Sequence, residues 1–193
     1  ESGQCKKFIA ISQMVKNDIL KHYRCPQENI SVVYNGVNLK RFHPGNENRQ
    51  SIRKELGITE STVLILFVGS GFERKGLKHL LQATQYLRSE DWRLVIMGKG
   101  KWNKYLQFAP KNLRSRIIHR EPVPEIEKYY SAADLFALPS IYEPFGNANL
   151  EALATGLPVI TSRHCGAADI IQHRLNGLIV ENPESPKEIA DNI

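Results

Sequence analysis

The chain has 193 residues, of which 41% are hydrophobic and 24% charged, and its formal net charge is +6. This length supports one substantial core, and there is no low-complexity tract or clear internal repeat. No apolar run approaches the roughly 20 residues that span a bilayer, and the first residues lack a signal-peptide pattern. A membrane-spanning protein is therefore not expected.

The first third of the chain predicts a small amount of regular structure followed by a linker. Apolar residues at 8–11 predict a core strand, and the β-branched run at 30–34 predicts a second strand. Ser12 is expected to cap the helix between them. The polar segment 40–51 predicts a linker or loop, and a short helix is then expected to end at Leu56.

Further along, strands and helices alternate with regularity. Continuous apolar runs are typical of parallel strands that are buried on both faces. Strands are expected at 63–68, 92–97, 117–118, 135–138, 159–160 and 178–180. Helices are expected at 76–87, 102–108, 126–133, 148–154 and 167–171. The pattern predicts a Rossmann-like, doubly wound parallel α/β sheet, whose ligands bind beyond the carboxyl ends of the strands.

Basic residues are concentrated in two stretches. Residues 1–54 hold ten Lys and Arg against four Asp and Glu, and residues 93–120 hold eight against none. Such surfaces attract anionic partners, although a solvated face without a partner is an equally good interpretation. No nucleic-acid motif accompanies the charge, so nucleic acid is not expected. If residues 93–120 face a membrane, we expect reversible contact with anionic lipid.

Cysteine and histidine spacing predicts no metal site. The three cysteines, Cys5, Cys25 and Cys165, share no ligand spacing and are expected to be reduced thiols in a cytoplasmic protein. The six histidines are each expected in a loop or on the surface, and His164 is interpreted as a bystander beside the candidate site. There is also no Asp-x-Asp motif.

A glycine-rich loop, Gly69-Ser-Gly-Phe-Glu-Arg-Lys-Gly, follows the first long strand. A dinucleotide fingerprint would require glycine where Arg74 stands, and Asp91, the acid about 20 residues on, precedes the next strand instead of following it. The nicotinamide interpretation therefore fails. Gly69 and Gly71 would let backbone approach a ligand, and the adjacent cations at a helix start suit a diphosphate. The plainer alternative is a surface turn.

Two carboxylates lie eight residues apart in the most informative segment, 139–159. Glu143 is expected in a loop that bends over the start of the next helix, and Glu151 within that helix. A ligand across the helix terminus would meet both, with phosphate on nearby amides. Those amides belong to Phe145, Gly146 and Asn147. The alternative is that Glu143 caps the helix and Glu151 is a solvated charge.

Together, Glu-x7-Glu and the ending Glu-Ala-x-Ala-x-Gly-x-Pro-Val resemble the signature of the group 1 (family four) retaining glycosyltransferases of the GT-B fold. Similar motifs follow in order along almost the whole chain, at 9–12 and 33–37 (interlobe hinge), 67–76 (phosphate loop), 133–140 (strand before the signature) and 165–170. In the last of these, Ala168 and Asp169 replace the usual Pro and Glu. These departures put that loop's ligand contact in doubt.

The resemblance implies a role for each site residue. Arg74 and Lys75, on the loop with Gly69 and Gly71, would bind the diphosphate and offset charge on the leaving nucleotide. The donor sugar and distal phosphate would meet Glu143 and the backbone of Phe145, Gly146 and Asn147. Glu151 would hold the ribose hydroxyls. Glu143, Arg74 and Lys75 would form the catalytic set, and no metal or other cofactor is implied.

The reaction implied is transfer of a hexose from a nucleotide-diphosphate sugar to a glycan or glycolipid, with retention. The glycine loop and Cys165-Gly-Ala-Ala are similar to enzymes of bacterial lipopolysaccharide core assembly, which implies a UDP-sugar donor and a cytoplasmic protein, peripheral at the inner membrane. Residues 1–45 would be the closing strand of an N-terminal lobe and the connector, and 46–193 the donor lobe. Both chain ends are interpreted as truncated, so the chain alone is expected to be inactive. The alternative is a non-catalytic nucleotide-binding domain.

Overall fold

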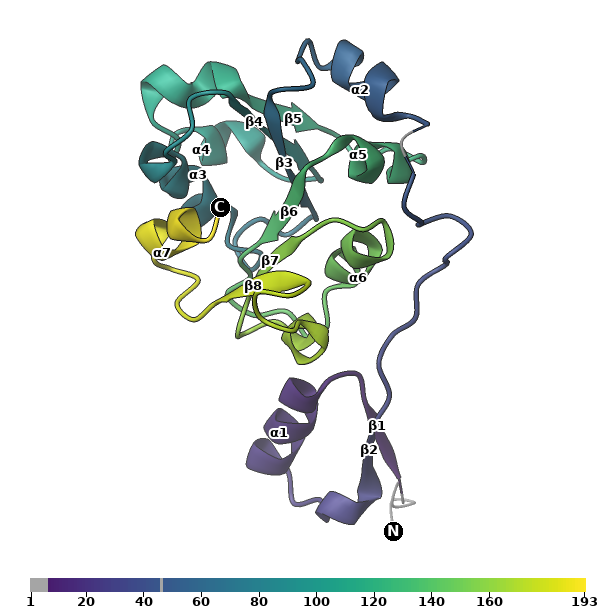
Figure 1. Cartoon of the computed structure of the whole chain (residues 1–193). Helices are drawn as coiled ribbons and strands as arrows, with labels where there is room; N and C mark the ends of the chain where they lie inside the picture. Colours follow the sequence, from purple (N-terminus) through teal and green to yellow (C-terminus); the bar gives the residue numbers. More distant parts are fainter. Residues whose placement is uncertain (1–6, 46) are drawn as a thin grey trace.

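The computed structural model describes residues 7–45 and 47–193. Within them, one parallel sheet has the strand order β5-β4-β3-β6-β7-β8 (Figure 1). Its strands are β3 (Val63–Val68), β4 (Trp92–Met97), β5 (Ile117–Arg120), β6 (Leu135–Leu138), β7 (Val159–Ser162) and β8 (Gly177–Val180). The order proceeds outward in one direction from β3 and in the other from β6. This reversal is the position at which doubly wound sheets bind ligands, and the predicted fold class is confirmed.

The centre of the sheet is apolar on both faces, as the unbroken sequence runs predict. In β3, Leu64, Ile65, Leu66 and Phe67 are each at most 1% exposed. Ile65 pairs with Leu94 of β4 on one side and with β6 on the other. A central strand flanked on both sides must bury consecutive side chains, which accounts for the absence of polar alternation.

Helices cover both faces of this sheet. They are α2 (Arg49–Glu55), α3 (Leu77–Ala83), α4 (Trp102–Leu106), α5 (Glu127–Ala132), α6 (Asn147–Ala154) and α7 (Pro186–Asp191). Figure 1 shows α3, α4 and α7 on one face and α2, α5 and α6 on the other. None of the helices in the described part of the chain has both the length and the hydropathy needed to cross a bilayer.

A small unit lies below this lobe in Figure 1. Strand β1 (Phe8–Ala10) pairs in parallel with β2 (Ile30–Val32), and α1 (Gln13–His22) connects them. Ser12 caps α1 as predicted, since its Oγ accepts from the Val15 amide at 3.1 Å. The strand predicted at 8–11 is present as β1, but the prediction that it is a core strand was wrong, because among the described residues β1 pairs with β2 alone and Ile9 is 70% exposed.

Residues 33–45, which we call the connector, run from the small unit along the lobe towards α2 (Figure 1). The connector has no regular strand or helix, and it turns at residues 39–41. It contributes the buried Phe42 to the lobe's core, and the partly buried Val37 packs against this core. Phe42 packs edge-on against Tyr130 of α5, with ring centroids 5.8 Å apart. The connector is therefore attached to the lobe at this end.

Several predicted helices are shorter than expected. The helix predicted at 76–87 ends at Ala83 and tightens into a 3₁₀ turn, where the Thr84 hydroxyl donates to the Leu81 carbonyl oxygen at 2.7 Å. The helix predicted at 167–171 is a 3₁₀ segment, Gly166–Ile170.

Candidate functional site

A cleft of about 520 Å³ lies where the strand order reverses, a size that suits a small ligand. Its walls come from the loop after β3, the loop after β6 together with α6, the segment between β1 and α1, and the connector. The lining residues include the predicted Gly69, Lys75, Glu143, Phe145, Gly146, Asn147 and Glu151. They also include Ile11 and Asn35, which sequence reasoning missed because only tertiary folding brings them here. The structure thus gathers most of the predicted site.

Two predicted residues, Gly71 and Arg74, do not line this cleft. Gly71 has a left-handed backbone, with φ of +75°, and its carbonyl oxygen accepts from the Lys75 amide at 3.2 Å. Arg74 stands at the rim with its side chain 46% exposed, and its Nη1 also donates to the Tyr142 carbonyl oxygen at 3.0 Å. Gly71 therefore shapes the turn that carries the two cations.

The loop after β3 depends on two further glycines. Gly69 has φ of +152°, and a Cβ there would overlap the aliphatic part of the Lys75 side chain. Gly76 has φ of +71°, and a Cβ there would overlap the Pro139 carbonyl oxygen. Because Gly69 has no side chain, the Lys75 side chain can cross the loop. Because Gly76 has none, the loop can lie against the end of β6.

Both cations bind one carboxylate oxygen. Lys75 Nζ lies 2.8 Å and Arg74 Nη1 2.9 Å from Glu143 Oε2. Burial alone would raise the pKa of Glu143, but the hydrogen bonds from Lys75 and Arg74 outweigh it, so the pKa lies below its ordinary value. Glu143 is thus held in its charged form between two positive groups.

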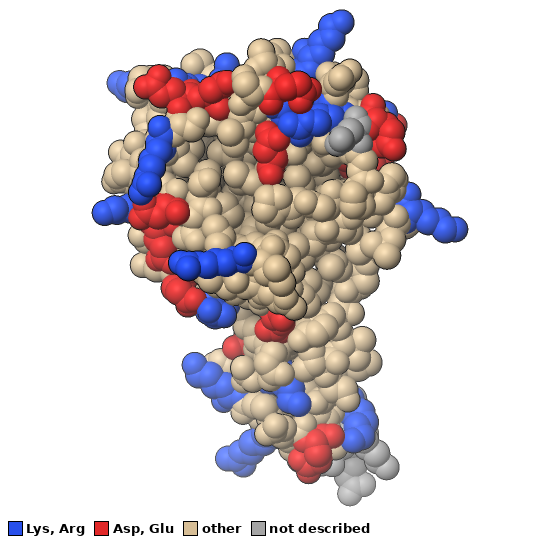
Figure 2. Space-filling model, in the orientation of Figure 1, with Lys and Arg blue, Asp and Glu red and all other residues tan. Residues whose placement is uncertain are grey.

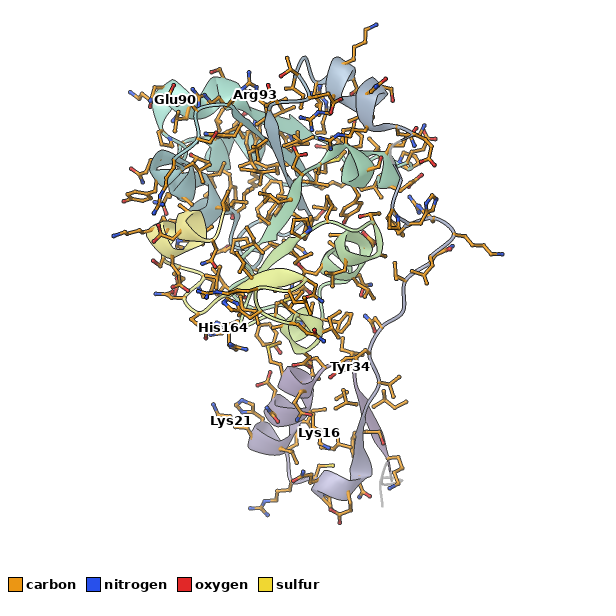
Figure 3. All side chains as sticks on the ribbon, viewed as in Figure 1. Lys16, Lys21, Tyr34, Glu90, Arg93 and His164 are labelled. Carbon is orange, nitrogen blue, oxygen red and sulfur yellow. The ribbon has the colours of Figure 1, made fainter. Side chains whose placement is uncertain are left out.

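The backbone of Glu143 is fixed as well. Its amide donates to the His164 carbonyl oxygen at 3.0 Å, and its own carbonyl accepts from Gly166 at 2.8 Å. The loops after β6 and β7 are therefore joined beside the cleft. His164 contributes backbone here and does not line the cleft, and its ring lies at the edge of the lobe (Figure 3).

Helix α6 begins at the cleft. Gly146 precedes it with φ of +85°, and a Cβ there would come within 2.8 Å of Asn149 Nδ2 and 2.9 Å of Cys165 Sγ. The first amides of a helix have no partner inside it and carry the positive end of the dipole. No side chain in the described part of the chain caps α6, so Glu143 is not its cap and that alternative was wrong. The terminus is left for a ligand.

Glu151 lies further along α6 and is not a solvated charge, so that alternative was wrong too. Its Oε2 accepts a hydrogen bond of 2.8 Å from the hydroxyl of Tyr130, which is fully buried on α5. Burial raises the pKa of Glu151, and Tyr130, Arg41 and Lys75 offset this only in part. Sequence reasoning missed Tyr130, because an aromatic residue within a predicted helix indicates only core packing.

The small unit contacts the same loops. Ser12 Oγ donates to the Pro144 carbonyl oxygen at 2.7 Å, and the Gln13 amide donates to Asp169 at 2.6 Å. In the loop that departs from the expected pattern, the Asp169 carboxylate is thus bound to the start of α1. The connector adds Asn35, whose Nδ2 donates to Asn147 at 2.7 Å. Figure 3 shows Tyr34 at the junction of the two parts.

The predictions for cysteine and histidine differ in outcome. Cys25 and Cys165 are free thiols, and Cys5 lies outside the described residues. The prediction that every histidine is in a loop or on the surface was wrong for two of them. His79 is buried on α3, and His119 is on strand β5, where its ring stacks on Trp102 of α4. In the described ranges, no group of three or more His, Cys, Asp or Glu could hold a metal ion.

The basic stretch 93–120 is not a uniform patch. Arg93 and Arg114 donate to backbone carbonyls, and the Arg116 guanidinium lies 5.5 Å from the centre of the Trp92 ring. On the face drawn in Figure 2, basic and acidic side chains stand next to one another over the lobe. Membrane contact by this stretch remains a prediction.

The fold and the cleft define one lobe of a GT-B enzyme, with two cations and a helix terminus at the strand reversal. Residues 48–193 match the family described as glycosyl transferases group 1, and residues 2–41 match glycosyltransferase family 4. The chain belongs to the group 1 glycosyl transferases.

Curated relatives support this membership. The uncharacterized glycosyltransferase MJ1607 of Methanocaldococcus jannaschii is 33% identical, over 95% of this chain and 49% of its own length. The lipopolysaccharide glucosyltransferase WaaG of Escherichia coli is 29% identical, over 99% of this chain and 53% of its own. The chain thus spans about half the length of these relatives.

Solved structures agree in fold. The crystal structure of WaaG, a glycosyltransferase involved in lipopolysaccharide biosynthesis, matches with a TM-score of 0.87 and 28% identity, over all of this chain and 54% of its own. Anabaena HepE in complex with UDP-glucose matches with a TM-score of 0.84, over 98% of this chain and 53% of its own. HepE is 22% identical, so it shows the fold alone.

Proposed function

We propose that this chain binds a nucleotide-diphosphate sugar as the donor lobe of a retaining hexosyltransferase. One observation carries the proposal: Glu143 holds Lys75 and Arg74 at 2.8 and 2.9 Å, beside the start of α6. Two cations and a helix N-terminus at one end of a cleft are the groups that bind a diphosphate. Glu151, further along α6, suits the hydroxyls of a ribose.

The same groups suit the chemistry of transfer. The bond between the anomeric carbon and the phosphate oxygen breaks, and the acceptor oxygen bonds that carbon on the same face. The acceptor's proton passes to the departing phosphate. Negative charge therefore grows on the diphosphate, where Lys75, Arg74 and the α6 terminus are already in place. These groups would do the work of a metal, so we propose metal-independent binding.

A second hollow supports a place for the base. It measures about 230 Å³, and it shares Val68, Gly69 and Ser70 with the cleft. Its other residues are largely apolar and include Met97 and Ile126. A flat aromatic base fits such surroundings, with the ribose between it and the diphosphate. We propose uracil, since the similar HepE was solved with UDP and with UDP-glucose.

The acceptor that we propose is a glycan or glycolipid of cell-envelope polysaccharide or lipopolysaccharide. The similarity to WaaG supports this choice. The acceptor would be held by the part of the protein that corresponds to the other half of the relatives. A cytoplasmic position, peripheral at the inner membrane, is part of the same proposal.

A nucleotide panel tests the binding function. UDP, UDP-glucose, GDP-mannose and ADP-glucose are each added to the chain in a thermal-shift assay, since a ligand that binds only the folded state raises its melting temperature. We expect a shift with uridine nucleotides, unchanged by EDTA. No shift with any nucleotide would exclude the proposal, and a shift lost with EDTA would exclude metal-independent binding.

The role of Glu151 has its own test. Glu151→Ala should weaken UDP, measured by calorimetry, and weaken 2′,3′-dideoxy-UDP much less, because the dideoxy ligand lacks the hydroxyls that the carboxylate would bind. Equal losses for the two ligands would show that Glu151 does not contact the ribose.

A further inference from the structure

The Glu151 carboxylate is held by a phenol from the neighbouring helix. Tyr130 on α5 is 0% exposed, and its hydroxyl lies 2.8 Å from Glu151 Oε2 and 3.3 Å from the Ala148 carbonyl oxygen. A buried hydroxyl is costly without a partner. Within the described ranges, no other side chain donates a hydrogen bond to Glu151. Tyr130 therefore fixes one carboxylate oxygen and leaves the other for a ligand.

The ring of Tyr130 is itself held from two sides. Phe42 of the connector packs edge-on at 5.8 Å, and Phe136 of β6 lies at 5.7 Å. Next to Phe42, Arg41 forms an ion pair of 2.8 Å with Glu127 at the start of α5. A ring packed between two aromatic neighbours has little freedom to turn. The hydroxyl is thus aimed at Glu151 before any ligand arrives.

We propose that Tyr130 is a positioning residue for the donor, which fixes Glu151 so that its free oxygen meets the ribose hydroxyls. This inference rests on the proposed function, because it takes Glu151 as the ribose ligand. Tyr130 itself does not line the cleft and would not touch the nucleotide. It acts through Glu151 alone, by setting the carboxylate's direction and keeping it charged.

The charge of Glu151 gives a readout that simple packing would not change. Three groups face it: Tyr130 from α5, Arg41 from the connector and Lys75 from the loop after β3. Burial raises the pKa of Glu151, and all three lower it. Without the phenol the pKa should rise further. The carboxylate would then become protonated at a higher pH than in the unaltered chain. On acidification, ribose binding would therefore begin to weaken at a higher pH as well.

Tyr130→Phe removes the hydroxyl and keeps the ring. We expect it to weaken UDP by about 10- to 150-fold in calorimetry at neutral pH, the range for one hydrogen bond to a charged group. The loss for 2′,3′-dideoxy-UDP should stay below about 2-fold. The matched control is Tyr129→Phe, because Tyr129 is the adjacent buried tyrosine and donates to Glu55 at 3.1 Å, outside the cleft. It should change neither affinity.

A double-variant cycle and a pH series complete the test. Once Glu151 is alanine, Tyr130→Phe should cause no further loss, because residues that act through one another are not additive. Between about pH 5 and 8, the fall in UDP affinity should begin at higher pH in Tyr130→Phe than in the unaltered chain. The nucleotide's own phosphate titration is common to both and cancels in the comparison.

The outcomes separate the two proposals. If the unaltered chain binds no nucleotide, the proposed function fails and this inference fails with it. If UDP binds and depends on Glu151, three results would overturn the inference alone: additive losses in the double variant, an equal loss for the dideoxy ligand, or an unchanged pH profile. Thermal unfolding of each variant confirms that binding is measured on folded protein.

Discussion

At the scale of single residues, the site is organised around one carboxylate oxygen. Glu143 Oε2 accepts from both Lys75 and Arg74. Two positive groups that share one carboxylate oxygen would repel each other if the carboxylate did not neutralise them. Glu143 therefore keeps the cations together at the cleft, and a diphosphate would add negative charge to a site that is already arranged for it.

Removing either cation should weaken the nucleotide. We expect Lys75→Ala and Arg74→Ala each to cost about 1.5–3 kcal/mol of UDP binding, the range for hydrogen bonds to charged groups. Calorimetry measures the loss. Lys78→Ala is the matched control, since Lys78 is an exposed cation on α3 outside the cleft. Unchanged affinity in both site variants would rule out the phosphate-loop assignment.

At the scale of elements, the site depends on a close approach between the loop after β3 and the end of β6. Gly76→Ala should lower the free energy of unfolding by more than about 1 kcal/mol, because alanine is strained at φ of +71° and its Cβ overlaps the Pro139 carbonyl. Urea denaturation measures the change. Gly36→Ala has open space around it and is the control, for which we expect almost no effect.

Helix α2 is attached to the sheet through a buried arginine. The Arg53 side chain is 1% exposed, and it donates to carbonyl oxygens of Thr59, Thr62 and Ala132 and to Asp134. We expect Arg53→Ala to cost about 3–5 kcal/mol of folding stability, as broken buried ion pairs do. Arg163→Ala removes an exposed pair and should cost less than about 1 kcal/mol. Similar losses in the two variants would contradict this account.

The ion pair between Arg53 and Asp134 also predicts that folding stability depends on pH. Burial would raise the pKa of Asp134, but hydrogen bonds from the Leu64 amide, Arg49 and Arg53 outweigh it and hold the pKa below its ordinary value. A lowered pKa adds stability above the unfolded-state pKa, about 3.8, and this stability is lost as pH falls through the folded-state pKa. Unfolding free energies of Asp134→Asn should therefore vary less with pH below about 4 than those of the unaltered chain.

The sequence predicted the strands better than it predicted the residues that hold the site residues in place. Continuous apolar runs such as Val63–Val68, alternating with helical segments, predict buried parallel strands, and a glycine loop after such a strand marks the edge of the sheet where ligands bind. Tyr130 and Asn35 gave no signal, because their partners lie 21 and 112 residues away in the chain. Helix ends were also missed, since Thr84 ends α3 through a side-chain contact that periodicity does not contain.

At the scale of the whole molecule, the chain corresponds to about half of the relatives that it matches. Orienting two reactants can lower a barrier by about 7–11 kcal/mol, which requires both to be held. We therefore predict that residues 1–193 bind UDP-glucose with micromolar to millimolar affinity and transfer no sugar at a measurable rate. A radiolabelled-donor assay, with a full-length group 1 glycosyltransferase beside it, measures this. Robust turnover on any acceptor would refute it.

The hydrogen bonds between the small unit and the lobe link two equilibria. Ser12 and Gln13 at the start of α1 bind the loops after β6 and β7, and these loops also hold Glu143 in place. Linkage is reciprocal: the factor by which loosening this junction lowers nucleotide affinity is the factor by which the nucleotide tightens the junction. A bound nucleotide would thus stabilise the contacts between the small unit and the lobe. Hydrogen exchange at the Gln13 amide, which the phosphate never touches, would slow when the cleft is filled.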